Sequence, residues 1–294
     1  MSKKWTILSG FWLKIIALFT MTLDHVGWAL AEFVGYDFFL VQPFRFIGRL
    51  ALPLFCFMIV EGVIHTKHFG KYALRLGIMA TAISIAIAFV EYTPFFEGFS
   101  IRSEGNIFLD LLLGAVCVYL LRREEIWCKI LAVIPLGIGV ASLISTSLEF
   151  SGTIIHWYPF FLRLQYGWYS VALIAGFYFA YALKDWALEY HEKQTGLPKE
   201  SLEGSYLDRN LTNVFAAGIL IVITTLFFVS SLMMDGQYVF WEADLQNAAM
   251  ISGAFILLYN GKRGYNAKWF EYGNYFYYPV HMLLIFGIFM LIFA

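Results

Sequence analysis

Long apolar runs alternate with short polar segments along the whole chain. Most of these runs reach about 18 residues or more, which is the length that an α-helix needs to cross the hydrocarbon core of a membrane. We therefore predict an all-α, polytopic helical membrane protein, with about nine transmembrane helices (8–10) forming a single bundle. The predicted helices cover residues 11–33, 44–64, 72–92, 105–121, 126–147, 166–184, 211–232, 245–259 and 272–293.

Two segments between these helices have a different pattern. Residues 151–165 are rich in aromatic side chains but are interrupted by Pro159, which favours an interfacial or re-entrant segment over a further span. Residues 185–210 mix both signs of charge, and we expect a solvated cytoplasmic loop with helical pieces. No repeat of fixed period is present in the sequence, so residues 1–294 are predicted to form one integral-membrane domain.

The composition agrees with a membrane protein and excludes other classes. Of the 294 residues, 60% are hydrophobic and 14% are charged, whereas soluble domains carry roughly 25% charged residues. The net charge of −1 gives no reason to expect a nucleic-acid partner. The three cysteines are far apart and the six histidines are scattered, so neither a disulfide framework nor a metal site is expected.

The distribution of basic residues predicts the orientation in the membrane. With a cytoplasmic N-terminus, all 20 Lys and Arg residues except Arg45, Arg49, Arg102 and Arg163 fall on or near the inner side. Cytoplasmic loops are enriched in Lys and Arg, so this arrangement is the favoured one. An odd number of spans then places the C-terminus outside, in a multi-pass protein of the plasma (inner) membrane.

An acidic and a basic residue lie next to each other inside the first predicted helix. The run LKIIALFTMTLDHVGWAL (Leu13–Leu30) contains Asp24 and His25 at a depth where one charged side chain costs roughly 2.5–3.5 kcal/mol to insert. One interpretation is a hydrogen-bonded pair that holds helices together. The other is a general base, because imidazole titrates near neutrality and an acidic neighbour can raise its basicity.

Two arginines on the second predicted helix share one face. Arg45 and Arg49 are four residues apart, and Arg49 reaches a depth comparable to that of His25. We expect Arg49 to pair with Asp24, either as structural glue or as the wall of a polar cavity around His25. Arg45 has two equal interpretations, since it can reach the headgroups or line the same cavity.

The last part of the chain offers candidates for binding a negatively charged ligand. The motif NGKRG (Asn260–Gly264) sets Lys262 and Arg263 between glycines, a composition that suits phosphate binding as well as a topology signal. Tyr278 and His281 are three residues apart on one face of the final predicted helix. Counting from the predicted helix starts, His281 lies about 10 Å closer to the cytoplasm than His25, so we expect that the two histidines do not act on one reacting atom.

These stretches together resemble the TraX family of membrane acetyltransferases. The resemblance rests on LKIIALFTMTLDHVG, on RLALPLF with its upstream arginine, on NGKRG and on YYPVHMLL, with weaker agreement in NIFLDLLLG and YGWYSVALI. It implies a branch of the transmembrane acyltransferase superfamily, which moves an acyl group from cytoplasmic acyl-CoA to an acceptor outside. It also implies that His25 is the catalytic position, that Asp24 orients it, and that Arg45 and Arg49 line the active cavity.

The chemistry of acyl transfer fits these residues. A base must deprotonate the acceptor and a cation must stabilise the oxyanion, which we assign to His25 and Arg49. The donor, acetyl-CoA or another acyl-CoA, is expected to bind without a metal through Lys262, Arg263, Asn260, Arg75, Tyr278 and His281. The expected acceptor is an amine or hydroxyl of an exported protein, a glycan, a cell-wall polymer or a lipid.

Two other classes of function remain open at the level of sequence. In a small proton-coupled transporter, Asp24, His25, Arg49 and Glu61 would relay protons or bind an anion. In a purely structural membrane protein, the same residues would form buried ion pairs. Binding or hydrolysis of acetyl-CoA by the purified protein separates these classes from an acyltransferase.

Overall fold

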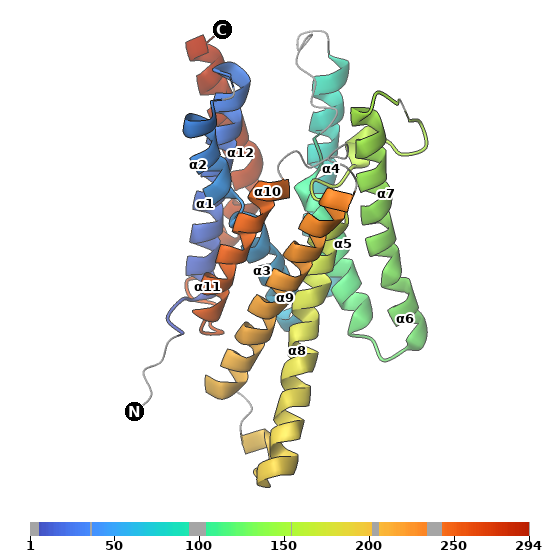
Figure 1. Ribbon diagram of the computed structural model, residues 1–294, viewed down its shortest axis with the longest axis vertical. Helices are drawn as coiled ribbons and strands as arrows, with labels where there is room; N and C mark the ends of the chain where they lie inside the picture. The colour runs from blue at the N-terminus through green and yellow to red at the C-terminus, as the bar shows by residue number, and fades with distance from the viewer. Residues whose placement is uncertain are drawn as a thin grey trace. The chain divides into compact units, whose positions relative to one another are not determined.

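The computed structural model describes residues 6–35, 37–93, 104–153, 155–201, 206–233 and 243–293 (Figure 1). Within these ranges the chain is helical, and its only β-type pairing is an isolated bridge between Leu8 and Tyr259. Arg102, assigned to the outer side by the charge distribution, lies outside the described residues.

The α-helices of the described residues are bounded as follows: α1 Gly10–Phe33, α2 Phe38–Gly48, α3 Ala51–His65, α4 Phe69–Tyr92, α5 Ile107–Leu121, α6 Ile126–Leu131, α7 Val133–Phe150, α8 Trp168–Thr195, α9 Tyr206–Met233, α10 Ala243–Gln246, α11 Ser252–Leu257 and α12 Lys268–Phe293. Short 3₁₀ helices η2, η3 and η4 cover Phe160–Leu162, Lys199–Ser201 and Asn247–Ile251.

The predicted fold class is confirmed. In the described part of the chain, seven helical segments are long and apolar enough to cross a membrane, with α2 and α3 counted as one segment. Two shorter apolar helices, Ile107–Leu121 and Asn247–Leu257, coincide with two further predicted spans. The protein is therefore a polytopic helical membrane protein, and the count of nine spans stays a prediction.

Several helices differ from their predicted bounds, among them the helix predicted at 44–64 and the helix that precedes the predicted loop. The predicted helix 44–64 is divided into α2 and α3, and α2 begins earlier because Asp37 caps it by accepting a hydrogen bond from the Leu40 amide at 2.9 Å. Helix α8 continues to Thr195, so the segment predicted as a loop (185–210) starts as helix. Helix formers occupy these positions up to Gly196, whose φ of 72° ends the helix in the left-handed conformation. Residues 202–205 of that segment lie outside the described residues.

The chain divides into two compact units. Unit 1 contains Met1–Met58, Phe179–Thr224 and Asp244–Ala294, and unit 2 contains Ile59–Tyr178 and Thr225–Ala243. In unit 1, α1 lies beside both α2 and α12 (Figure 1).

Helices α1 and α12 run parallel. Near their starts the rings of Phe11 and Phe270 are 5.0 Å apart, and further along the rings of Trp28 and Phe286 are 4.7 Å apart. The two helices therefore begin at the same end, and the start of α1 and the end of α12 lie at opposite ends of this pair.

Glycines allow α1 and α2 to approach each other closely. A Cβ atom on Gly27 would lie 2.8 Å from Cβ of Phe44, and one on Gly48 would lie 2.2 Å from Cβ of Asp24. Small residues at such crossings let helix backbones come together, which drives much of helix association in lipid. The close approach places residues of the α2 C-terminus directly against Asp24.

In unit 2, the backbone N–H and C=O groups of the non-helical segment that follows α7 form hydrogen bonds with residues of neighbouring helices and their caps. The Asn106 amide donates to the Arg163 carbonyl at 2.8 Å, and the Leu164 amide donates to the Ser142 hydroxyl at 2.8 Å. The buried carboxylate of Asp110 accepts from the amides of Gln165 and Tyr166 at 2.7 and 3.0 Å. Irregular backbone is tolerated at membrane depth when protein groups satisfy it in this way.

We predict that replacing two nearby glycines of α7 by alanine has opposite effects on stability. A Cβ on buried Gly139 would lie 2.8 Å from Cα of Trp168, whereas one on exposed Gly137 would meet nothing within 4 Å. Gly139→Ala should destabilise unit 2 by about 1–3 kcal/mol through overpacking. Gly137→Ala should be neutral or stabilise by up to about 1 kcal/mol. Thermal unfolding in detergent measures both, and equal melting temperatures for the two variants would contradict the packing.

Candidate active site

Two histidines from the ends of the sequence form a hydrogen-bonded pair in unit 1. His25 Nδ1, on α1, lies 2.6 Å from His281 Nε2, on α12, and the two rings stack with their centroids 4.8 Å apart. His281 is buried and His25 is partly buried. The pair is held where two parallel helices touch, so its geometry depends directly on the α1–α12 contact.

The prediction that these histidines lie at different depths was wrong. Helix α12 begins at Lys268, four residues before its predicted start, so His281 is 13 residues into its helix. His25 is 15 residues into α1, and the two helices begin at the same end. At about 1.5 Å per residue, both rings therefore lie about 20 Å from that end.

Aromatic residues of α12 surround the pair. The ring of Tyr278 meets the ring of His25 edge-on at 5.7 Å, and the ring of Tyr277 stacks on that of His281 at 4.8 Å. His281 Nδ1 lies 2.6 Å from the carbonyl oxygen of Tyr277, and the Tyr277 hydroxyl hydrogen bonds to Thr22 of α1 at 2.7 Å. Tyr278 and His281, which sequence reasoning assigned to donor binding, thus lie beside the proposed base.

Asp24 makes its contacts with the two arginines of α2. Arg45 Nη1 lies 2.8 Å from Asp24 Oδ2, and Arg49 Nη2 lies 3.9 Å from Asp24 Oδ1. The expected pairing of Arg49 with Asp24 is present, although Arg45 is the closer partner. Asp24 was expected to orient His25, but its carboxylate pairs with the arginines, and Nδ1 of His25 is hydrogen-bonded to His281.

This ion cluster contains two guanidinium groups and one carboxylate. Arg49 is only 4% exposed and the Asp24 and Arg45 side chains are 13% exposed, so solvent screens them little. Asp24 directly precedes His25 in the sequence, so the ion pairs of this carboxylate hold both guanidinium groups against the same segment of α1. Such a preorganised charge in a low-dielectric site suits a transition state that develops a negative oxygen.

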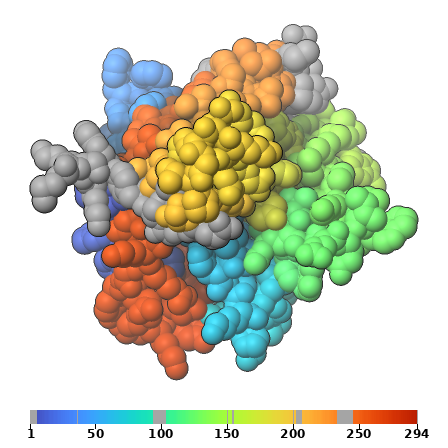
Figure 2. Space-filling view, turned by 90° about the horizontal axis from the view of Figure 1, so that it is seen from below, coloured from blue at the N-terminus to red at the C-terminus, as the bar shows by residue number. Residues whose placement is uncertain are grey.

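The NGKRG loop (Asn260–Gly264) lies against the first residues of α1, at the end where α1 and α12 begin. The amides of Gly10 and Phe11 donate to the carbonyls of Lys262 and Arg263 at 2.8 and 3.0 Å. Gly261 has a φ of 72°, and the Lys262 amide donates to the Asn260 side chain at 2.9 Å. The backbone of the loop is thus fixed, while the side chains of Lys262 and Arg263 are exposed; Figure 2 views the molecule from this end.

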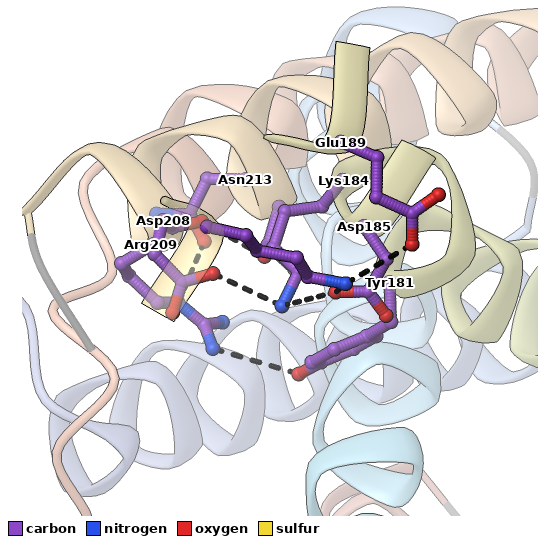
Figure 3. A network of polar contacts seen from close by, with 9 residues as sticks. Tyr181, Lys184, Asp185, Glu189, Asp208, Arg209 and Asn213 are labelled. Atoms are coloured by element: carbon purple, nitrogen blue, oxygen red, sulfur yellow. Dashed lines mark hydrogen bonds and ion pairs between the residues drawn. The ribbon is translucent and has the colours of Figure 1, made fainter. Parts of the chain in front are cut away.

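Arg209 of α9 is a cation at this loop that sequence reasoning missed. Its guanidinium lies 4.3 Å above the Tyr259 ring, and its Nε donates to Asn213 at 3.0 Å (Figure 3). Asn213 in turn donates to the Tyr259 carbonyl at 2.8 Å. Arg209 belongs to the polar segment 185–210, but that segment mixes both signs of charge, so its pattern offered no reason to select this arginine.

Two further candidates complete the set. Arg75, expected to assist in donor binding, lies on α4 in unit 2, outside the cluster described above. Asn274 lies two helical turns before His281 on the same face of α12, and its buried Nδ2 donates to none of the described residues. Within the described ranges, no group of three or more His, Cys, Asp and Glu side chains is placed to hold a metal ion.

Comparisons with known proteins match part of this chain. The family model described as TraX protein matches residues 9–197, which include Asp24, His25, Arg45 and Arg49. A probable fimbrial assembly protein FimC, serogroup H1, of Dichelobacter nodosus is 30% identical over 159 residues, or 51% of this chain. That match covers 63% of the relative, less than two thirds of its length. No solved structure matches the chain.

We predict that Asp24 is coupled more strongly to Arg45 than to Arg49. Asp24→Asn leaves buried cations without a full counter-charge, so it should destabilise the protein by about 3–5 kcal/mol. Double-mutant cycles of Asp24→Asn with Arg45→Gln, and separately with Arg49→Gln, compare the 2.8 Å and 3.9 Å contacts. Equal coupling energies, or a larger one for Arg49, in unfolding titrations would contradict this geometry.

Proposed function

The chain belongs to the TraX family, and we propose that it is an integral-membrane acyltransferase. It moves an acyl group, in the simplest case acetyl, from cytoplasmic acyl-CoA to an amine or hydroxyl acceptor at the outer face. The N-terminus is then cytoplasmic and the C-terminus is outside. The observation that carries the proposal is the His25–His281 pair, because α1, which carries His25, also carries Asp24 of the ion cluster and begins at the basic loop.

The distance between the loop and the histidine pair suits a thioester donor. Gly10, which bonds to the Lys262 carbonyl at 2.8 Å, is 15 residues before His25, or about 22 Å along α1. Coenzyme A carries phosphates that cannot enter lipid, and its extended pantetheine arm spans roughly 15–20 Å. The arm is about 2–7 Å shorter than this rise, so the thioester reaches His25 when the phosphates bind about one helical turn inside the first residue of α1.

We assign the donor phosphates to the cations of the NGKRG loop. Lys262 and Arg263 are exposed there, Arg209 is fixed against Tyr259, and convergent cations bind phosphate through charge-assisted hydrogen bonds. Asn260 shapes the loop, and Asn274 offers a buried amide donor to a carbonyl of the arm on the way to His281. Arg75 stays a candidate for the same ligand on the grounds of charge alone.

The reaction follows from the residues at the histidine pair. His25 takes the proton from the acceptor while the acceptor nitrogen or oxygen attacks the thioester carbonyl carbon. The negative oxygen of the tetrahedral intermediate is stabilised by the guanidinium groups of Arg45 and Arg49. When the carbon–sulfur bond breaks, the thiolate leaves and receives the proton held by His25.

The acceptor is proposed to be an exported protein subunit. The named relative is a probable fimbrial assembly protein, which supports a protein acceptor. The N-terminal amine of such a subunit is a suitable nucleophile once His25 has removed its proton. Glycan, cell-wall polymer and lipid acceptors have the same chemistry and are alternatives for the assay.

The first test of this function removes the base. A general base contributes typically about 10²–10⁴-fold, so His25→Gln should lower turnover by that factor. Binding of acyl-CoA and the melting temperature should stay close to those of the unchanged protein, because the loop and the helix contacts remain. Full turnover in His25→Gln would reduce the pair to helix packing and would favour a transport function.

The second test neutralises the donor site. Lys262→Ala together with Arg263→Ala should raise the KM for acyl-CoA by about tenfold or more, since the loss of about 1.4 kcal/mol of binding free energy corresponds to a factor of ten. The KM for the acceptor should not change. The matched control is Lys67→Ala with Lys71→Ala, two exposed lysines that the charge distribution assigns to the same side and to which no donor contact is assigned. If both double variants change the donor KM equally, the loop acts only through net charge.

A further inference from the structure

The contacts of the histidine pair determine which nitrogen of His25 is the base. We infer that His281 is a positioning residue that holds His25 as the Nδ1–H tautomer, so that Nε2 carries the lone pair. The tautomer follows from the hydrogen-bond geometry of the two rings in their neutral state. Its catalytic meaning rests on the proposed acyltransferase function.

The argument begins at the carbonyl of Tyr277. A carbonyl oxygen can only accept a hydrogen bond, and it lies 2.6 Å from Nδ1 of His281. His281 must therefore carry a hydrogen on Nδ1. In neutral imidazole only one ring nitrogen carries a hydrogen, so Nε2 of His281 is an acceptor.

The same reasoning then applies across the helix pair. His281 Nε2 lies 2.6 Å from His25 Nδ1, so His25 must donate from Nδ1. Neutral His25 consequently has its lone pair on Nε2. A resting charge on either ring is disfavoured, because it would add a cation at membrane depth to those of Arg45 and Arg49.

This arrangement gives the pair a defined role in each half of the reaction. His25 Nε2 accepts the proton of the acceptor as the new bond to the acyl carbon forms, and the ring becomes a cation. The Nδ1–H bond to His281 persists and is strengthened, because its donor is now charged. The same proton passes from Nε2 to the leaving thiolate, so the pair ends the cycle as it began.

His281 cannot pass the proton onward in this scheme. Its Nδ1–H is directed at the Tyr277 carbonyl, which is not a base, so no proton leaves through α12. It fills the place that the resemblance assigned to Asp24, as a neutral acceptor that sets the orientation and tautomer of the base. A buried carboxylate has this role in the Ser-His-Asp triad.

The tautomer is measurable without any enzymatic assay. The full-length protein labelled with ¹⁵N-histidine, in lipid nanodiscs, should give one protonated (pyrrole-type) Nδ1 and one unprotonated (pyridine-type) Nε2 signal for His25. The His25→Gln variant assigns these signals by their loss. A His25 ring protonated on Nε2 would overturn the inference, whether or not the protein transfers acyl groups.

A second experiment tests the catalytic meaning of the tautomer. His281→Gln keeps a side-chain oxygen that can accept from His25 Nδ1–H, whereas His281→Phe keeps the ring shape and removes the acceptor. Turnover should fall by less than about tenfold in the first variant and by about 10²-fold or more in the second. The donor KM should change in neither, because the loop cations are intact.

The matched control removes a different polar contact between the same helices. Thr22→Val breaks the 2.7 Å bond to Tyr277 one turn before His25 and should leave turnover unchanged. If His281→Phe is as active as the unchanged protein, or Thr22→Val loses as much activity, His281 acts through packing and the inference fails. If the unchanged protein transfers no acyl group, the proposed function fails, while the tautomer measurement still decides the inference.

Discussion

In a bundle surrounded by lipid, a polar side chain has to find its partner within the protein, because hydrocarbon offers neither donors nor acceptors. The parallel contact of α1 with α12 meets this requirement for two histidines at once. His25 Nδ1 and His281 Nε2 are hydrogen-bonded to each other, and the Tyr277 carbonyl accepts the hydrogen bond from Nδ1 of His281. The site is therefore a consequence of how these two helices align.

The same alignment connects the site to the surface. Since α1 and α12 begin at one end, the loop that precedes α12 is bonded to the first residues of α1. The basic side chains of that loop consequently lie at the start of α1, and the histidine pair lies further along the same helix. Gly48 adds the third element, because the absence of a Cβ lets α2 place Arg45 and Arg49 against Asp24.

Hydropathy and periodicity predicted the fold class and most helix positions, because both depend on local composition. Local composition also drew attention to Asp24, His25, Arg45 and Arg49, since charges are costly in a span. Local composition could not predict contacts that depend on which helices pack against each other. The His25–His281 contact needed the parallel alignment and a helix start that was misplaced by four residues, and neither can be read from apolar runs.

Partner choice was equally hard to read from one sequence. Asp24 lies next to His25 in the chain, yet successive side chains on a helix diverge by about 100°, so its carboxylate faces α2 instead. Arg209 lies in a stretch of mixed charge that looks like an ordinary solvated connector. Only its position over the Tyr259 ring relates it to the NGKRG loop.

The two units differ in how completely their buried polar groups are satisfied. In unit 2 the carboxylate of Asp110 accepts from two backbone amides and a serine, and Arg163 pairs with Glu149. Such closed networks hold a fold together. In unit 1, buried atoms of Gln246 and Asn274 make no hydrogen bond with the described residues, although an unmet buried amide costs about 1–3 kcal/mol. A donor arm or acceptor carrying amides of its own would recover that free energy, which supports the proposal that the ligands bind in the unit that holds the histidine pair.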